Sequence, residues 1–368
     1  MFIDYRTVQD HARGQWLDIF RSLAPALDDA VSKNGRHVRC PNPQHDSPDG
    51  FRLFKDSNET GGGICSSCGS FAGGISLLQW VNDWDFKTTI NQLAGHLNLT
   101  SQDTVKPVQR SVQQVHRPLS DEEKKKGEQR KKQMNAIWQE SLPLEHAESE
   151  VGRMYFVRRG FSATRHIVGL KPVIRFHPAM PYYHEGTCQG NMPCLVSLVS
   201  DKAGKPVTLH RTFLDKEGKK LSPNAFPWKE SAPSAKKIMP LPPGVSMTGG
   251  AIRIGEPGAI LGVAEGIETA LAVSVTTGQT VWPCVSASML QKFIPPAGVR
   301  EIWIWCDLDR SKAGVKAAHA LKSQLTNKGI QCRVNVPPMP LVDGEKSRDW
   351  ADVMTAMGRM GFPAFRTH

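Results

Sequence analysis

The stretch Glu301–Gly314, EIWIWCDLDRSKAG, decides the fold of the C-terminal part of the chain. It opens with a continuous apolar run, which is typical of a strand buried on both faces of a parallel sheet. The run ends at two acidic residues, Asp307 and Asp309, with only Leu308 between them. Because two like charges at the end of a buried strand cost free energy, the pair indicates a site for positively charged groups.

Segments that predict strands alternate with segments that predict helices over residues 259–368. This alternation predicts a multidomain α/β (α+β) protein whose last domain is a parallel sheet flanked by helices. We expect the strands at 259–265, 280–286, 301–307 and 331–336, and the helices at 267–277, 288–294, 313–325 and 348–357. The sequence contains no G-x-x-x-x-G-K-[ST] motif and therefore encodes no P-loop motor.

A third acidic residue, Glu265, ends the first of these strands. Functional groups gather at the carboxyl ends of parallel strands, so Glu265, Asp307 and Asp309 should converge if their strands are neighbours. Such clustering is costly unless divalent cations neutralise it, and carboxylate oxygens suit Mg²⁺ or Mn²⁺. For Asp307 and Asp309 the alternative is a solvated turn that caps a helix.

Further acidic residues lie near this predicted edge. Asp349, in the segment SRDWADV, is the candidate for a fourth acid, and Asp352 is a weaker one. Glu268 lies in the first turn of a predicted helix, where the helix dipole alone favours an acid. Both a structural and a functional role therefore stay open for Glu268.

A second constellation lies near the N-terminus. Cys40, His45, Cys65 and Cys68 follow the spacing C-x4-H and then C-x2-C. Two short-spaced ligand pairs can meet at one tetrahedral Zn²⁺, and four protein ligands indicate a structural ion. His37 is a poorer fourth ligand because it precedes Cys40. The alternative is four unrelated buried residues.

Two other cysteines, Cys188 and Cys194, flank the segment QGNMP with looser spacing. We interpret them as incidental and expect no second metal site with His184.

Composition limits the class of partner. The 368 residues carry a formal net charge of +11, which favours a polyanionic partner, either nucleic acid or an anionic membrane. The alternative is that the charge serves solubility alone. No apolar run is long enough to cross a membrane, and the first residues do not resemble a signal peptide. We therefore expect a cytoplasmic protein with reduced cysteines and no membrane partner.

Four segments follow from these patterns. Residues 1–100 form the zinc-ribbon domain, 101–149 a charged linker or helix, 150–258 a strand-rich basic subdomain and 259–368 the parallel-sheet domain. Within the basic subdomain, residues 194–220 predict two strands around a turn at Ala203–Gly204.

The motifs VAEGIETALA, IWCDLDRSKAGVKAA and SRDWADV together resemble the Toprim domain of primases. The cysteine and histidine pattern, followed by GGISLLQWV and DFKTTINQLAGHL, resembles the zinc-binding domain of bacterial and phage primases. The combination is similar to the bacterial-type DNA primase superfamily, and most similar to primases of plasmids, phages and other mobile elements.

This resemblance implies synthesis of short RNA primers from NTPs on single-stranded DNA by metal-dependent nucleotidyl transfer. The family's metal-binding glutamate corresponds to Glu265, its D-x-D pair to Asp307 and Asp309, and a further catalytic acid to Asp349. The segments LHRTFLD and SAKKIM correspond to the family's nucleotide- and template-binding part. The candidates for those contacts are His210, Arg211, Lys236 and Lys237.

Departures from the family's pattern leave other functions open. The first ligand pair is spaced more widely than in cellular primases, and no helicase motor is encoded, so a helicase would be a separate chain. The alternatives are a zinc-ribbon and Toprim replication accessory protein that binds DNA, or a Toprim nuclease. A topoisomerase needs a nucleophilic Tyr, and none of the four Tyr lies in an evident catalytic context.

Overall fold

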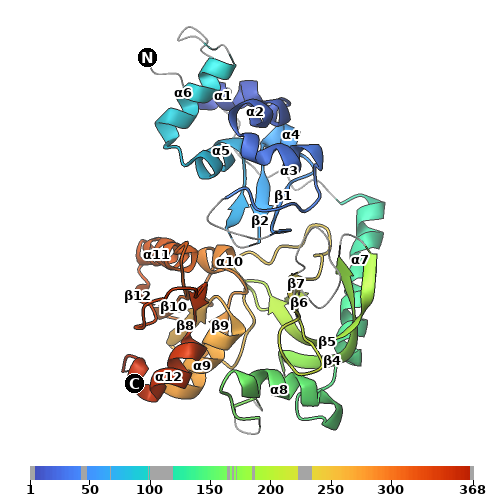
Figure 1. Cartoon of the computed structure of the whole chain (residues 1–368), viewed down its shortest axis with the longest axis vertical. Coiled ribbons are helices and arrows are strands. Elements are labelled where there is room, and N and C mark those ends of the chain that lie inside the picture. The colour runs from blue at the N-terminus through green and yellow to red at the C-terminus, as the bar shows by residue number, and fades with distance from the viewer. Residues whose placement is uncertain are drawn as a thin grey trace. The chain divides into compact units, whose positions relative to one another are not determined.

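The structure of this chain is a computed structural model (Figure 1). It describes residues 5–42, 48–66, 68–97, 99, 119–163, 166–167, 170, 172–184, 187–222 and 234–364. The chain divides into two compact units, of which the second is made of Leu119–Pro227 and Pro233–His368. Residues 5–99 provide the helices and strands of the first.

The first unit combines short helices with a three-stranded antiparallel sheet in the order β1-β2-β3. Its elements are α1 (Tyr5–Ala12), α2 (Trp16–Leu23), the 3-10 helix η1 (Pro25–Leu27), α3 (Asp28–Ser32), β1 (Phe51–Leu53), α4 (Ser57–Thr60), β2 (Gly63–Cys65), β3 (Gly69–Phe71), α5 (Gly74–Asn82) and α6 (Phe86–His96).

The core of this first unit is built around helix α2. Its apolar residues Trp16, Ile19 and Phe20 recur at helical spacing, so they share one face, and all three are buried. They pack in one cluster with Leu77 and Leu78 of α5. Helix α2 thus presents one apolar face to the core of the first unit.

The second unit contains an antiparallel sheet and a parallel sheet. Its first elements are α7 (Asp121–Glu140), η2 (Ala147–Ser149), α8 (Glu150–Arg158), β4 (Ile174–His184), β5 (Thr187–Ser200), β6 (Pro206–Phe213) and β7 (Lys236–Ile238). They are followed by β8 (Ile260–Ala264), α9 (Ile267–Thr277), β9 (Val281–Pro283), α10 (Ala287–Gln291), β10 (Glu301–Trp305), β11 (Leu308–Asp309), α11 (Ala313–Thr326), β12 (Gln331–Asn335), β13 (Ser347–Arg348), α12 (Trp350–Met357) and η5 (Gly358–Gly361).

The antiparallel sheet has the order β4-β5-β6-β7. Strands β5 and β6 form the predicted hairpin, which turns at Ala203–Gly204. The carboxylate of Asp201 accepts hydrogen bonds from the backbone N–H groups of Ala203 at 2.9 Å and Lys205 at 3.0 Å, and thereby holds the turn.

The parallel sheet has the order β12-β10-β8-β9. Helices α9 and α12 cover one face, and α10 and α11 cover the other (Figure 1). This arrangement confirms the parallel sheet with covering helices that the sequence predicts. The apolar run of β10 is buried because it lies inside the sheet, between β8 and β12.

Among the described helices, none combines the length and the apolar character needed to cross a bilayer.

Gly74 provides a test of packing in the first unit. A Cβ atom at Gly74 would lie 2.1 Å from Cε3 of the buried Trp16, so Gly74→Ala forces the tryptophan or α5 to move. We expect a loss of about 1–3 kcal/mol in the free energy of unfolding, measured by denaturant unfolding. The matched control is Gly95→Ala in α6, where a Cβ meets nothing within 4 Å and should stabilise the helix. Equal stability of the two variants would contradict this account.

Candidate functional site

The parallel sheet brings acidic side chains to one edge. Strands β8 and β10 pair in parallel, with Ala264 opposite Trp305. Glu265 directly follows β8, and Asp307 follows β10 after one intervening residue. Both strands therefore deliver a carboxylate to the same carboxyl edge, which is where open α/β sheets bind ligands.

Asp307 is held by a short chain of hydrogen bonds. The Thr269 hydroxyl donates to Asp307 Oδ1 at 2.6 Å, and the backbone N–H of Trp350 donates to Thr269 Oγ1 at 3.4 Å. The Trp350 indole N–H donates to the carbonyl of Cys306 at 3.1 Å. Helices α9 and α12 are thus both tied to the end of β10, which restricts the position of the Asp307 carboxylate.

Asp309 interacts with the start of helix α11. Its two carboxylate oxygens each accept a backbone N–H at 3.4 Å, one from Ala313 and one from Gly314, and Oδ1 also accepts the Ser311 hydroxyl. Asp309 lies opposite Ser347 in the β11–β13 pair. These hydrogen bonds are the ones that the alternative prediction, an acid at a helix N-terminus, would give Asp309.

Gly314 allows α11 to approach the acidic edge closely. A Cβ atom at this position would lie 2.9 Å from the carbonyl oxygen of Asp307 and 3.5 Å from Oε2 of Glu265. Any larger residue would push the helix away from the backbone that carries Asp307. The glycine of the RSKAG segment is thus needed for the close packing of α11 against the acidic edge.

The acidic edge is electrostatically unfavourable without a cation. Burial raises the pKa of Glu265, the ammonium of Lys236 opposes this rise, and the like charge of Asp309 adds to it. Burial and then the neighbouring Glu265 carboxylate raise the pKa of Asp307 well above its ordinary value. Half-buried carboxylates that repel one another are a donor set suited to a hard divalent cation.

Asp349 lies at the N-terminus of α12 and caps it. Its carboxylate accepts the backbone N–H groups of Ala351 at 2.9 Å and Asp352 at 3.0 Å, and Asp352 returns a bond to the Asp349 N–H at 2.9 Å. The same carboxylate forms an ion pair with Arg159 from the end of α8. Burial raises the pKa of Asp349, and Arg159 counteracts that rise.

Glu268 lies inside a cluster of polar side chains. Its side chain is 4% exposed, and Oε1 lies 2.6 Å from Nζ of Lys220 and 3.3 Å from Nζ of Lys236. The Tyr155 hydroxyl also donates to Oε1. Burial alone would raise the pKa of Glu268, but the two ammonium groups, with the Lys220 and Tyr155 hydrogen bonds, hold it well below its ordinary value.

The four predicted nucleotide- and template-binding residues divide between the two faces of the antiparallel sheet. His210 lies opposite Ile238, Arg211 opposite Lys237, and Thr212 opposite Lys236. Because side chains alternate along a strand, His210 and Lys236 share one face and Arg211 and Lys237 share the other. Only the first face looks toward Glu268 and the acidic edge.

These four residues also differ in charge state and contacts. Burial and the charge of Lys236 lower the pKa of His210 to about 3, so its imidazole is neutral near pH 7. Burial lowers the pKa of Arg211, whose guanidinium lies 5.8 Å from the Phe213 ring centroid. The ammonium of Lys237 donates to the carbonyl of Tyr183 at 2.6 Å.

A pocket of about 600 Å³ lies beside Asp349. Its lining includes the cations Arg158, Arg159, Lys220 and Arg348. The sequence-based prediction missed Lys220 and Arg159. Lys220 lies in a stretch rich in Lys and Arg, and Arg159 is the second of two consecutive arginines before Gly160. Neither pattern indicates which of these cations faces the acidic side chains.

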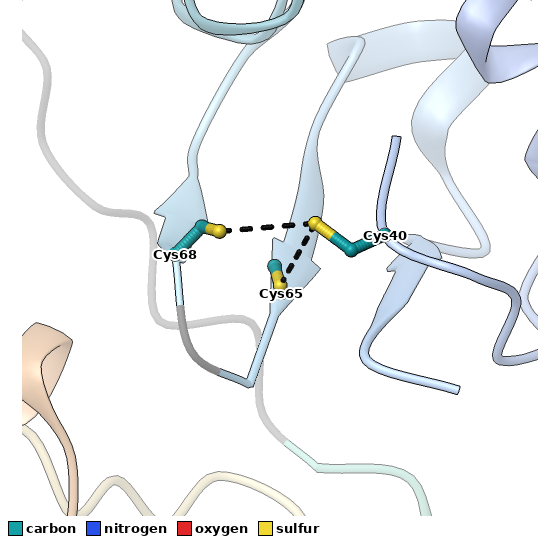
Figure 2. Close-up of side chains that lie close together, drawn as sticks. All are labelled: Cys40, Cys65 and Cys68. Atoms are coloured by element: carbon teal, nitrogen blue, oxygen red, sulfur yellow. Dashed lines mark hydrogen bonds between the residues drawn. The ribbon is translucent and has the colours of Figure 1, made fainter. Parts of the chain in front are cut away.

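The cysteines of the first unit converge as predicted. The Sγ atom of Cys40 lies 3.6 Å from that of Cys65 and 3.7 Å from that of Cys68 (Figure 2). Cys65 ends β2 and Cys68 directly precedes β3, and the Val38–Phe51 bridge holds the Cys40 segment against β1. His45, the predicted fourth ligand, lies outside the described residues.

The chemistry of the three thiols fits a zinc ion. Hydrogen bonds to Cys40 and then to Cys65, together with burial, raise the pKa of Cys68, so without metal this thiol holds its proton. Zn²⁺ would replace the thiol protons and bind the thiolates. Within the described part of the chain, Cys40, Cys65 and Cys68 form the one group of three or more metal-ligating side chains whose ligand atoms all lie within 4.8 Å.

The remaining cysteine and histidine candidates do not form a second cluster among the described residues. Cys188 is exposed, Cys194 is buried and His184 is 6% exposed.

Three family models match the chain. Residues 260–360 match the Toprim domain, and residues 35–75 match the zinc-binding domain of primase-helicase. Residues 128–249 match a domain of unknown function, DUF7146. No curated protein sequence matches the chain.

The parallel sheet with acids at its carboxyl edge is therefore a Toprim domain. The chain therefore combines this Toprim domain with an N-terminal zinc-binding domain of primase-helicase type, which holds the three cysteines.

Solved primase structures are similar to this chain at low identity. The Aquifex aeolicus primase, with its zinc-binding and RNA polymerase domains, is 13% identical with a TM-score of 0.40, covering 94% of this chain and 83% of that one. A DnaG primase catalytic domain bound to ssDNA is 17% identical with a TM-score of 0.42, covering 65% and 77%. The primase fragment of the bacteriophage T7 primase-helicase is 16% identical with a TM-score of 0.33, covering 55% and 69%.

Zinc content tests the cysteine cluster. Cys68→Ser removes one thiolate, so we expect at least a several-fold loss of zinc, measured by elemental analysis of the purified protein. The matched control is Cys188→Ser, which alters an exposed cysteine outside the cluster and should leave the zinc content unchanged. A Cys68→Ser protein with full zinc content would remove Cys68 from the ligand set.

The stability of the metal-free protein tests the acidic edge. The raised pKa of Asp307 means that ionisation destabilises the folded state, and this cost develops as pH rises above about 3.9, the ordinary Asp value. Asp307→Asn should therefore raise the free energy of unfolding by on the order of 1 kcal/mol near pH 7, and by less as pH falls toward 4. Thermal unfolding in EDTA at pH 7 and at pH 4 measures these stability differences. An Asp307→Asn protein that is less stable than wild type at pH 7 would contradict the repulsion between the carboxylates.

Proposed function

We propose that this protein is a DNA primase that synthesises short RNA primers from NTPs on single-stranded DNA. The observation that carries the proposal is the position of the acidic edge. Glu265 and Asp307 follow the ends of neighbouring strands of a Toprim domain, and the ammonium of Lys236 interacts with both. Lys220 joins Lys236 at the nearby carboxylate of Glu268. A chain that also carries a zinc-binding domain of primase-helicase type combines these groups with a means of contacting a template.

The acids are the proposed metal ligands. Glu265, Asp307 and Asp309 hold Mg²⁺ or Mn²⁺ at the sheet edge, and Asp349 completes the acidic set from α12. Bound divalent cations would lower the pKa of the attacking 3′-hydroxyl and stabilise charge on the leaving pyrophosphate. The hydrogen bond from Thr269 keeps Asp307 oriented toward this edge.

The proposed role of the cations is to bind the triphosphate. Lys236 lies close enough to Glu265 and Asp307 for the three charges to interact, so a phosphate held at the acidic edge would also meet its ammonium. Lys220 and Arg159 line the neighbouring pocket and add donors for the other phosphate oxygens. His210 is neutral near pH 7 and supplies no positive charge to a phosphate.

The template is proposed to meet other parts of the chain. Arg211 and Lys237 lie on the opposite face of the antiparallel sheet, where they are candidates for contacts with the DNA backbone. The zinc domain, with Cys40, His45, Cys65 and Cys68 as its proposed ligands, helps to recognise the template and to start the primer. A formal net charge of +11 supports a nucleic-acid partner.

The biological setting is part of the proposal. The protein would act in the cytoplasm, in the replication of a plasmid, phage or other mobile element. Its partner would be a separate replicative helicase. The proposed domain limits are 1–100 for the zinc-ribbon domain, 101–149 for the charged linker or helix, 150–258 for the basic subdomain and 259–368 for the Toprim domain.

Primer synthesis is the direct test of this function. The purified protein is incubated with labelled NTPs, single-stranded DNA and Mg²⁺ or Mn²⁺, and the products are resolved on a denaturing gel. We expect short RNA products from the wild type, and a loss of at least about a hundredfold for Asp307→Asn, because that change removes a charged metal ligand.

The matched control is Asp343→Asn, which removes an exposed carboxylate from a loop and should keep full activity. Full-rate synthesis by Asp307→Asn would reject the metal-site assignment. A wild type that makes no product on any template would reject the primase function and favour the accessory protein. Degradation of the DNA instead would favour a Toprim nuclease.

A further inference from the structure

The side chain of Glu268 contacts side chains from three separate parts of the fold. The residue itself lies in the first turn of α9, Tyr155 comes from α8, Lys236 from β7 and Lys220 from the loop that follows β6. The Tyr155 hydroxyl and the Lys220 ammonium both reach Oε1, and the Lys236 ammonium lies 3.4 Å from Oε2. One carboxylate therefore links the antiparallel sheet to the Toprim sheet.

The occupied oxygens exclude Glu268 from the metal-ligand set. A divalent cation at Glu268 would displace two ammonium groups and a phenol from a carboxylate that is 4% exposed. Charge repulsion between the cation and the two lysines opposes that exchange. Glu268, three positions after Glu265, thus binds the ammonium groups of Lys220 and Lys236 and not a metal ion.

The lysines keep access to solvent while the carboxylate does not. The side chains of Lys220 and Lys236 are 39% and 38% exposed, compared with 4% for Glu268. Two ammonium groups therefore share the one carboxylate of Glu268, and both remain accessible from solvent. They lie next to the acidic edge, because Lys236 also interacts with Asp307 and Glu265.

We propose that Glu268 is a positioning residue for nucleoside triphosphate: its buried carboxylate fixes the ammonium groups of Lys220 and Lys236 at the spacing that binds the phosphates beside the acidic edge. This inference rests on the proposed primase function. Without the carboxylate, the two ammonium groups repel each other and turn toward solvent, so the phosphate site loses its geometry.

The test compares Glu268→Gln with wild type in primer synthesis over a range of NTP concentrations. Gln keeps the size of the side chain but removes the charge that holds both lysines. We expect the apparent KM for NTP to rise about tenfold while kcat falls less than about threefold, since the lost interaction acts on binding. Glu268→Asp, which keeps the charge, should recover most of the affinity.

Two further measurements separate positioning from other roles. The Mg²⁺ concentration that gives half-maximal activity should be the same in Glu268→Gln as in wild type, whereas loss of a metal ligand would shift it. Zinc content and the thermal unfolding midpoint show whether the variant is folded. The matched control is Glu256→Gln, which neutralises an exposed glutamate and should keep the wild-type KM.

An unchanged or lowered KM in folded Glu268→Gln, or a shifted Mg²⁺ requirement, would overturn the positioning role. Equilibrium binding of a fluorescent ATP analogue keeps this test separate from the proposed function. If wild type makes no primers, the primase function fails, and tighter binding of the analogue to wild type than to Glu268→Gln would still support the positioning role. Equal binding by the two proteins would reject it.

Discussion

Repulsion between carboxylates at the ends of two neighbouring parallel strands is the constraint on which the second unit depends. The pairing of β8 with β10 forces Glu265 and Asp307 to the same edge, and burial raises the pKa of both. The surrounding elements reduce the free-energy cost of this repulsion. Thr269 donates a hydrogen bond to Asp307, the start of α11 donates to Asp309, and Lys236 brings a positive charge. A folded state that tolerates such repulsion is one that gains by binding a cation.

Opposite charges also join the two sheets of this unit. Glu268 on the Toprim side contacts Lys220 and Lys236 from the antiparallel side, and Arg159 at the end of α8 pairs with Asp349 at the start of α12. The elements that hold the acids are thereby connected to those that carry the cations. A phosphate group needs both, because metal ions neutralise some of its charge and ammonium groups bind its remaining oxygens.

Much of the fold followed from local patterns. Alternating strand and helix segments, apolar runs without polar interruption and acids at strand ends predicted the parallel sheet and its acidic edge, because these features are short-range and periodic. The cysteine spacing likewise predicted that the thiols of Cys40, Cys65 and Cys68 would meet. The role of Glu268 could not be resolved, because a first-turn acid looks the same whether it serves the helix dipole or a pair of lysines. Lys220 and Arg159 were missed because their partners lie far away in sequence.

By itself, the sequence determined which chemical groups this protein has and which of them lie at strand ends or in short-spaced pairs. Such patterns depend on neighbouring residues and on backbone periodicity alone. Only the tertiary structure decided which cations face the acids. Lys236 and Lys237 are adjacent in the chain, yet strand alternation sends one toward Glu268 and the other to the opposite face. The register of β7 beside β6, which long-range packing sets, determines which of them meets the acidic edge.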